Sequence, residues 1–217
     1  MAEIKIARNR NRRGRPRVRP DGETRHVIYE AARRGFAAGG YGATSMESVA
    51  HCAGVSTKTL YRLFPNKAAL YEGTMSDRFD RLASGFALRA ATDHPDIEEA
   101  LCSALTTCAA LVLDEEVVAL QRMVLQEADK FSDVAGTFYA NAVQRTAGAL
   151  ADWLQVQQTR GLIALDDVGE AAGMLLGMVA SAPQRAAIFG GRPLPSRSQI
   201  EARVRTCAAL FLRGCQV

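Results

Sequence analysis

The feature that most constrains this chain is a pair of short helix signatures joined by a glycine turn, in residues 44–67. Thr44 is a favourable N-cap residue and Glu47 follows three residues later, so the two predict a capping box at the start of a first helix. Gly54 can adopt the left-handed conformation that ends such a helix in a tight turn. Ser56 then predicts the N-cap of a second helix. The segment therefore predicts a compact helical hairpin.

Three small or apolar residues supply the packing of this hairpin. Ala50 lets the helices approach closely, Gly54 turns the corner and Leu60 fills the angle between them. This is the spacing of a helix-turn-helix motif. Pro65 ends the second helix, because the residue before a proline is pushed out of helical conformation, and Asn66 is placed to cap a third. The same packing residues would also suit an ordinary helical hairpin in an all-helical core.

The outward side chains of the second helix distinguish between these alternatives. They are short hydroxyls, cations and one phenol, with no acidic side chain among them: Ser56, Thr57, Lys58, Thr59, Tyr61 and Arg62. Side chains of these kinds hydrogen-bond to phosphates and base edges, whereas an ordinary solvated helix face also carries Glu or Asp. The pattern therefore favours a helix that reads a groove of DNA.

The first twenty residues carry the positive charge of the chain. They contain eight basic side chains and one acidic side chain, a net charge of +7, so residues 21–217 contribute −3 to the overall +4. Prolines, a glycine and the lack of apolar residues predict that residues 1–20 form a disordered arm. We expect this arm to contact phosphates or enter a minor groove through Arg13, Arg15 and Arg17. A solubilising tail, or an arm for another anionic partner, is the alternative.

Residues 44–71 resemble the DNA-binding segment of the TetR/AcrR family of transcriptional regulators; they read TSMESVAHCAGVSTKTLYRLFPNKAALY. The matching elements are the Thr-Ser opening, the Ala-Gly-Val-Ser turn, the Leu-Tyr pair, the Phe, and the Lys two residues beyond the proline. The preceding helix fits as well, at Ala31, Ala32, Phe36, Gly40 and Tyr41. The resemblance covers roughly residues 23–71, about a quarter of the chain.

The resemblance implies which residues contact DNA. We expect residues 56–62 to read the groove, and Thr44, Tyr61 and Lys67 to hold phosphates. The complete set of predicted DNA-binding residues is Arg13, Arg15, Arg17, Thr44, Ser45, Ser56, Thr57, Lys58, Thr59, Tyr61, Arg62 and Lys67. Two positions depart from the family pattern: Lys58, where Gly is frequent, and Leu63, where His or Tyr is frequent. We therefore expect the operator sequence to differ from those of relatives.

Beyond the hairpin the apolar pattern predicts helices to the end of the chain, with no alternating strand pattern. Helices are expected at about residues 23–38, 67–89 and 132–158, and from Pro95, Asp114, Asp166 and Ser196 onward. The predicted fold class is all-α, with an N-terminal three-helix domain that contains the helix-turn-helix. The resemblance implies that residues 21–70 bind DNA, and that residues 71–217 form a helical domain for ligand binding and dimerisation.

Small residues recur every four positions in the helix expected after Asp166: Gly169, Gly173, Gly177 and Ser181. Such a stripe allows close helix packing, either at a dimer face or inside one subunit. In the family the last two helices of each subunit form the dimer interface. The predicted interface residues are accordingly Gly173, Gly177, Met178, Val204 and Phe211. Pro183 should kink or end this helix.

The resemblance also implies a ligand cavity among the C-terminal helices. The predicted lining residues are Met123, Gln126, Phe138, Tyr139, Trp153 and Met174. An apolar set with a few polar groups suits a lipophilic small molecule, although the same residues would suit a filled core. No feature of the sequence names the effector.

Cysteines and histidines indicate neither a metal site nor a disulfide framework. The five cysteines form no Cys-x-x-Cys pair and the three histidines are scattered, so no metal or cofactor is expected. A redox role for Cys102 or Cys108 stays open. The longest uncharged apolar runs are about fourteen residues, too short to span a bilayer, and the N-terminus lacks the apolar segment of a secretory signal. We expect a cytoplasmic protein without a membrane partner.

The expected function is that of a DNA-binding transcriptional regulator, a ligand-responsive repressor that binds a near-palindromic double-stranded operator as a homodimer. Two recognition helices would occupy successive major grooves about 34–36 Å apart, and ligand would pivot the helix that begins at Lys67. An activator of the same fold is the first alternative. The second alternative is a small-molecule-binding protein or enzyme with a vestigial hairpin. The third is a helical adaptor that binds acidic proteins. The sequence shows no phosphate-binding glycine loop or nucleophile elbow that would support an enzyme.

Overall fold

The computed structural model describes residues 20–83 and 96–215, and within them every regular element is helical. The predicted all-α fold class is thus confirmed. The N-terminal part contains α1 (Asp21–Ala43), α2 (Met46–Ala53), α3 (Thr57–Leu63) and α4 (Lys67–Ala83). The C-terminal part contains α6 (Ile97–Val112), α7 (Glu115–Glu127), α8 (Ser132–Phe138), π-helical η2 (Tyr139–Gln144), α9 (Arg145–Thr159), α10 (Val168–Leu176), π-helical η3 (Gly177–Ser181), α11 (Ala182–Ile188) and α12 (Arg197–Cys215). The predicted basic arm lies outside the described residues, apart from Pro20.

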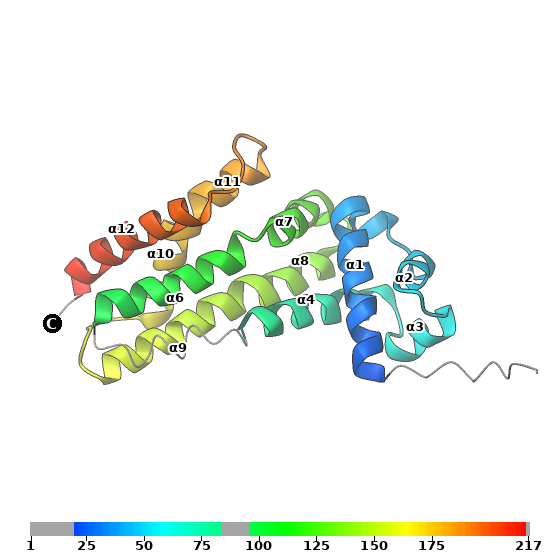
Figure 1. The fold of residues 1–217 in the computed structure, drawn as a ribbon, viewed down its shortest axis with the longest axis horizontal. Coiled ribbons are helices and arrows are strands. Elements are labelled where there is room, and N and C mark those ends of the chain that lie inside the picture. The colour runs from blue at the N-terminus through cyan, green and yellow to red at the C-terminus, as the bar shows by residue number, and fades with distance from the viewer. Residues whose placement is uncertain (1–19, 84–95, 216–217) are drawn as a thin grey trace, which may run out of the picture.

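The helices form an elongated molecule with the helix-turn-helix at one end (Figure 1). α1 crosses that end, and α2 and α3 lie on its outer side. α4 leads from α3 back into the body, where it packs against α8. α6, α9, α10 and α12 extend to the opposite end. The helix predicted to read DNA is therefore presented at one tip of the molecule.

Three predicted helix boundaries in the hairpin are confirmed. Gly54 is left-handed (φ 65°, ψ 33°) and ends α2. The hydroxyl of Ser56 accepts the backbone N–H of Thr59 at 3.0 Å, and Oδ1 of Asn66 accepts that of Ala69 at 2.8 Å. Because each bond satisfies an N–H that has no partner within the helix, α3 and α4 begin where the sequence predicts.

The predicted capping box at Thr44 is wrong by one residue. Ser45 is the N-cap of α2: its Oγ accepts the N–H of Ser48 at 3.0 Å, and Ser48 Oγ accepts the N–H of Ser45 at 3.2 Å. Thr44 is buried, and its hydroxyl donates to the carbonyl of Gly40 at 2.7 Å. α1 runs past its expected end at Ala38 and reaches Ala43. It is kinked at Gly40, whose φ of +82° is not helical.

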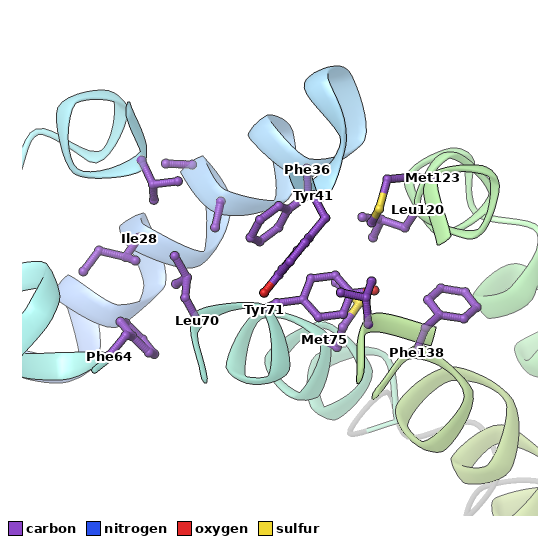
Figure 2. Packing of buried hydrophobic residues seen from close by; sticks show 14 of the residues in the cluster. Ile28, Phe36, Tyr41, Phe64, Leu70, Tyr71, Met75, Leu120, Met123 and Phe138 are labelled. Carbon is purple, nitrogen blue, oxygen red and sulfur yellow. The ribbon is translucent and has the colours of Figure 1, made fainter. Parts of the chain in front are cut away.

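One buried core joins the helix-turn-helix to the middle of the molecule (Figure 2). The rings of Phe36 and Tyr41 on α1 lie with their centroids 5.3 and 5.5 Å from that of Tyr71 on α4, both in edge-to-face geometry. Met123 of α7 and Phe138 of α8 extend the same core. Aromatic pairs of this geometry contribute about 0.5–1.5 kcal/mol each beyond the area they bury. The end of the molecule that carries the helix-turn-helix is therefore packed directly on α7 and α8.

α4 crosses the predicted division between residues 21–70 and residues 71–217. Leu70 and Tyr71, on either side of that division, are both almost completely buried in the shared core. The division into two domains stays a prediction. Its boundary would fall inside a helix whose side chains pack on both sides of it.

A second buried core holds the other end of the molecule together. It contains leucines of α6, α9 and α10 and small residues of α12, among them Leu101, Leu105, Leu150, Leu154, Leu175 and Ala208. The helix expected over residues 132–158 is present but contains the π-helical turn η2. A second π-helical turn, η3, lies directly before Pro183, where the sequence predicts a perturbed helix. Proline lacks the N–H of a regular turn, and a π turn is one way for a helix to accommodate this.

Three properties of the described ranges concern membranes, metal ions and cysteine thiols. No helix there is long and apolar enough to cross a membrane. The His, Cys, Asp and Glu side chains of these ranges form no group of three or more that could hold a metal ion. Burial raises the pKa of the Cys108 thiol to about 12, and burial is also the main cause of the raised pKa of Cys102. Both thiols are therefore protonated at neutral pH, which disfavours a redox role.

Candidate DNA-binding surface and ligand cavity

The outer face of α3 presents hydroxyl and cationic side chains to solvent, while Leu60 and Leu63 fix the helix to the core. Thr57 and Lys58 are exposed at the first turn. The hydroxyls of Ser56 and Thr59 lie 2.8 Å apart, so the start of the helix is held by a side-chain bond in addition to its cap. With the cap and the buried leucines in place, α3 is a rigid carrier for its exposed residues.

Glu47 of α2 lies against the middle of this face. The Tyr61 hydroxyl donates to Oε1 of Glu47 at 3.3 Å, and the Tyr61 side chain is still half exposed. The acidic group was missed at the sequence level because it belongs to the neighbouring helix. The hydrogen bond from Tyr61 to Glu47 fixes the orientation of the Tyr61 side chain on the surface of α3. The ring and hydroxyl of Tyr61 remain accessible to solvent.

Arg62 of α3 is paired with Asp21, the first residue of α1. Its Nη1 and Nη2 donate to the two carboxylate oxygens of Asp21 at 2.9 and 2.7 Å, a bidentate pair. This hydrogen bond is the main reason that the pKa of Asp21 is lowered. The two side chains remain more than half exposed, so the pair lies within reach of another anion. The sequence gives no sign of it, because forty residues separate the partners.

Replacing Asp21 by asparagine should free the Arg62 guanidinium with little change in side-chain size. We expect DNA affinity to rise several-fold at low salt. The slope of log affinity against log salt should steepen by about 0.9, the value for one more phosphate contact. Fluorescence anisotropy with a labelled duplex over about 50–200 mM salt measures both. In the control, adding Arg62→Ala to Asp21→Asn should cancel the change; an unchanged slope in Asp21→Asn alone would count against a phosphate contact by Arg62.

The ammonium group of Lys67 is directed at the protein backbone, whereas the sequence predicts that it contacts a phosphate. Its ammonium donates to the carbonyls of Tyr41, Thr44 and Gly42 at 2.7, 3.0 and 3.3 Å. The same nitrogen lies 4.4 Å from the centroid of the Tyr41 ring. All three N–H groups of the ammonium are thus directed at carbonyls that α1 leaves without a helical partner. Lys67 closes the end of α1.

Thr44 is also placed away from solvent, with 6% of its surface exposed and its hydroxyl bonded to Gly40. A direct phosphate contact from this side chain does not fit that position, whereas the neighbouring Ser45 is exposed. Arg13, Arg15 and Arg17 lie outside the described residues. The chain that carries them joins α1 at Asp21, next to Arg62 of α3.

A cavity of about 250 Å³ lies between α7, the η2–α9 segment and the α10–η3–α11 segment. Its apolar lining includes Val117, Phe138, Ala142, Leu176 and Ala180, and its polar lining consists of Gln121, Thr146, Ser181 and Gln184. None of the lining side chains is charged. Val143, Gly173 and Ser181 are exposed, so the cavity communicates with solvent along the η2 and α10–η3 edges.

Five of the six predicted cavity residues lie elsewhere in the part of the chain that the structure describes. Phe138 lines the cavity. Met123 and Trp153 are buried in the first and second cores. Gln126, Tyr139 and Met174 are exposed. Of the predicted set, only Phe138 thus lines this cavity, because helical periodicity separates buried from exposed faces but cannot tell a filled core from a hollow one.

The predicted dimer residues divide into two groups. Gly173 and Gly177 line the cavity, so part of the small-residue stripe makes room inside the subunit. Val204 is buried in the second core, and Phe211 is half-buried against it. Met178 lies in a shallow surface groove. Of these five residues, Met178 is the one placed on a surface between η3 and α12.

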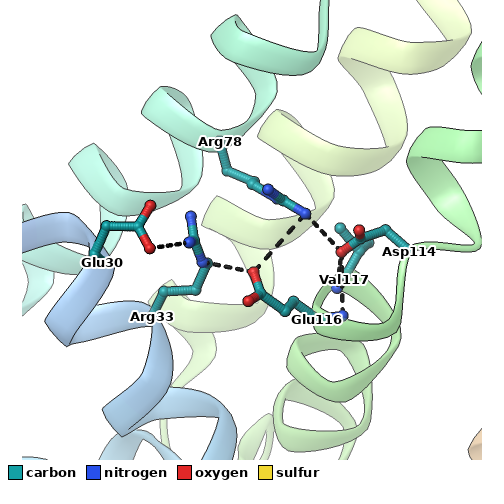
Figure 3. Close-up of polar contacts among 6 residues, drawn as sticks. All are labelled: Glu30, Arg33, Arg78, Asp114, Glu116 and Val117. Carbon is teal, nitrogen blue, oxygen red and sulfur yellow. Dashed lines mark hydrogen bonds and ion pairs between the residues drawn. The ribbon is translucent and has the colours of Figure 1, made fainter. Parts of the chain in front are cut away.

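A charged network joins α1, α4 and α7 (Figure 3). Arg33 of α1, only 6% exposed, has Nη2 2.5 Å from Oε2 of Glu30 and Nε 2.6 Å from Oε2 of Glu116. Arg78 of α4 lies between the same Glu116 oxygen, at 3.8 Å, and Oδ1 of Asp114, at 2.7 Å. The network thus fixes the N-terminus of α7 to both helices of the DNA-binding end. Charge in the sequence does not reveal it, because Arg33 and Glu116 are 83 positions apart.

Further hydrogen bonds hold the two ends of α7. At its N-terminus Asp114 Oδ1 accepts the N–H groups of Glu116 and Val117 at 3.1 and 3.2 Å, as an N-cap does. At its C-terminus the carboxylate of Glu127 accepts the N–H of Gly42 at 2.9 Å. Through Glu116 and Glu127, α7 is therefore attached to α1 at both ends. Val117 in its first turn and Gln121 one turn later form one wall of the cavity.

Comparisons with known proteins agree with this geometry. Residues 28–74 match the family model described as bacterial regulatory proteins of the tetR family. Residues 99–215 match the model for the C-terminal domain of the AefR-like transcriptional repressors. A structure from Mesorhizobium loti MAFF303099, assigned to the TetR family, superposes with a TM-score of 0.80 at 27% identity, covering 92% of this chain and 100% of that one. The flavonoid-responsive regulator FrrA superposes with a TM-score of 0.72 at 28% identity, over 90% and 98%.

One curated relative is similar over part of the chain. The HTH-type transcriptional activator FasR of Mycolicibacterium smegmatis (strain ATCC 700084 / mc(2)155) is 41% identical over 86 residues, which are 39% of this chain and 38% of that protein. The matched family models together account for both the helix-turn-helix and the C-terminal helices. The chain therefore belongs to the TetR family, and it is a DNA-binding transcriptional regulator.

Proposed function

We propose that the protein is a ligand-responsive repressor that binds a near-palindromic operator as a homodimer in the cytoplasm. The observation that carries the proposal is the face of α3, where Thr57, Lys58 and Tyr61 are exposed on a helix that is capped and packed from behind. Hydroxyl, ammonium and phenol groups at one tip of the molecule suit the major groove. Activation is the alternative, favoured by the name of the curated relative FasR.

The C-terminal helices support the two other parts of the proposal. The name of FrrA, a flavonoid-responsive regulator, and the uncharged cavity both favour a small-molecule effector. Met174 and Leu210 are 64% and 56% exposed on α10 and α12, and Leu210 shares a surface groove with Met178. Exposed apolar side chains on these two helices favour pairing with a second copy. Sedimentation should then give a dimer at micromolar concentration.

The route from the cavity to DNA would run through α7 as well as α4. A ligand that displaces Val117 or Gln121 moves a helix attached to α1 through Glu116 and Glu127. α1 in turn holds α3 through Asp21. The effector would shift the population between two dimer states that differ in the separation of the recognition helices.

Selection of bound duplexes from a random pool tests the proposal, because it yields the operator, its symmetry and its half-site spacing together. We expect two half-sites with centres one helical turn apart or a multiple of it. Replacing Lys58 by alanine should change the preferred base at one or two positions, at a cost of about 1–3 kcal/mol for a base contact. Replacing exposed Arg213 by alanine is the control, since it removes one positive charge from the last turn of α12, at the opposite end of the molecule from α3. Recovery of unrelated sequences without symmetry would contradict the proposal.

A further inference from the structure

The cavity between α7, α9 and α10 has features that restrict what it can bind. Both π-helical turns in the described ranges contribute to it: η2 through Ala142 and Val143, and η3 through Gly177 and Ala180. π turns inside α-helices occur frequently at functional sites, where they displace the side chains of one turn from regular positions. Two such turns on opposite walls of one cavity indicate that the space is built into the fold.

The absence of charge in the lining excludes ionised ligands. A carboxylate or ammonium group taken from water into a site without a counter-charge loses several kcal/mol of hydration energy. The nearest helices do carry charged residues, but none of these side chains lines the cavity. A ligand that enters fully is therefore neutral.

One buried polar atom in the lining is an acceptor without a partner. Oε1 of Gln121 is buried and has no hydrogen-bond partner in the protein. The Thr146 hydroxyl donates to the carbonyl of Ala142 at 2.7 Å, and Nε2 of Gln184 donates to that of Val112 at 2.9 Å. These donors are already engaged with the backbone, whereas the Gln121 oxygen and the Thr146 lone pairs are not. An unpartnered buried acceptor is costly unless a ligand supplies a donor.

We propose that the cavity binds a neutral molecule of one or two rings that carries a hydroxyl or N–H donor, and that Gln121 Oε1 accepts that donor. The volume of about 250 Å³ lies below the 300–1,000 Å³ of sites for drug-sized ligands, which sets the upper limit on size. The inference rests on the proposed effector response, since it assigns a chemical class to the molecule that acts there.

A series of three naphthalenes with one ring system tests the class directly. 2-Naphthol is neutral and carries a donor, 2-methoxynaphthalene is neutral without a donor, and 2-naphthoate is charged. We expect calorimetry or thermal shift to show 2-naphthol binding at least about tenfold more tightly than the methyl ether, the usual value of one hydrogen bond. The carboxylate should not bind. Equal binding of 2-naphthol and its ether, or preferred binding of the carboxylate, overturns the proposal.

Protein variants locate the site. Gln121→Met removes the acceptor at similar volume, so it should weaken 2-naphthol about tenfold and leave the methyl ether unchanged or tighter. Gly173→Leu should weaken both neutral probes, because a Cβ at Gly173 meets no atom within 4 Å and the longer side chain extends into the opening. If neither variant changes 2-naphthol binding, the compound binds elsewhere and the proposal fails.

DNA binding is measured in parallel without ligand, so the two failures can be told apart. The wild-type protein serves for this comparison, because Gln121 lines the cavity and lies on the proposed route from the cavity to DNA. Loss of all naphthalene binding in a protein that still binds its operator overturns the ligand class alone. Normal discrimination among the naphthalenes by a protein that binds no operator would uphold the ligand class and overturn the proposed repressor.

Discussion

Replacing Arg33 by alanine is expected to lower the free energy of unfolding by about 1.5–3 kcal/mol, the contribution of a hydrogen bond to a charged group. The Arg33 side chain is 7% exposed and lies between carboxylates of α1 and α7, which are 31% and 44% exposed and regain water when it is removed. Without it, Arg78, at 3.8 Å, is the one cation that remains paired with Glu116 in the part of the chain that the structure describes. Urea unfolding at constant m-value measures the change.

Two further variants separate charge from packing in this prediction. Arg33→Met keeps most of the aliphatic stem, so it should recover the packing part of the loss and leave the cost of the unpaired carboxylates. Arg197→Ala is the matched surface control: its side chain is 89% exposed, its partner Glu201 lies one turn away, and the expected change is within about 0.5 kcal/mol. If Arg33→Ala and Arg197→Ala cost the same, the network does not stabilise the fold.

Replacing Lys67 by methionine should destabilise the protein by about 2–3 kcal/mol and weaken DNA binding as a consequence. The ammonium makes three hydrogen bonds to carbonyls at the end of α1, and bonds from a charged donor contribute about 1.5–3 kcal/mol each before losses from non-additivity. Its contact with the Tyr41 ring adds about 0.5–1 kcal/mol. Thermal unfolding and DNA titration of the same sample give the two effects together.

The salt dependence of binding decides between this role and a phosphate contact. If Lys67 only closes α1, the slope of log affinity against log salt stays that of the wild type, because no phosphate contact is lost. A phosphate contact predicts a slope shallower by about 0.9 with unchanged stability. Lys67→Arg is the conservative control: a planar guanidinium cannot direct three N–H groups at three converging carbonyls, so it should restore only part of the stability.

Local signals in the sequence were sufficient for the fold class and for most of the hairpin. Caps such as Ser56 and Asn66 depend on bonds to residues three positions away, and these can be predicted from spacing. The start of α2 was predicted one residue early, because Thr44 and Ser45 are both suitable caps and the kink at Gly40 decides between them. A choice of that kind depends on the preceding backbone.

Long-range partners were beyond the reach of the sequence. Asp21 and Glu47 contact α3 from other helices, so the outer face of α3 is less purely cationic than its own residues suggest. The lining of the cavity could not be read from the sequence for a related reason. Gly173 and Gly177 predict close packing by their size, yet here they leave space, and only the positions of the surrounding helices distinguish the two outcomes.

The pairing of Asp21 with Arg62 has a consequence for the search along a genome. Any phosphate that takes the guanidinium must first displace a carboxylate held by two hydrogen bonds, so on random DNA the exchange yields little net free energy. At the operator the other predicted contacts of α3 would fix the position of that phosphate and so favour the exchange. The carboxylate would then lower affinity for the vast excess of competing sites more than for the correct one, and would raise the ratio that determines occupancy.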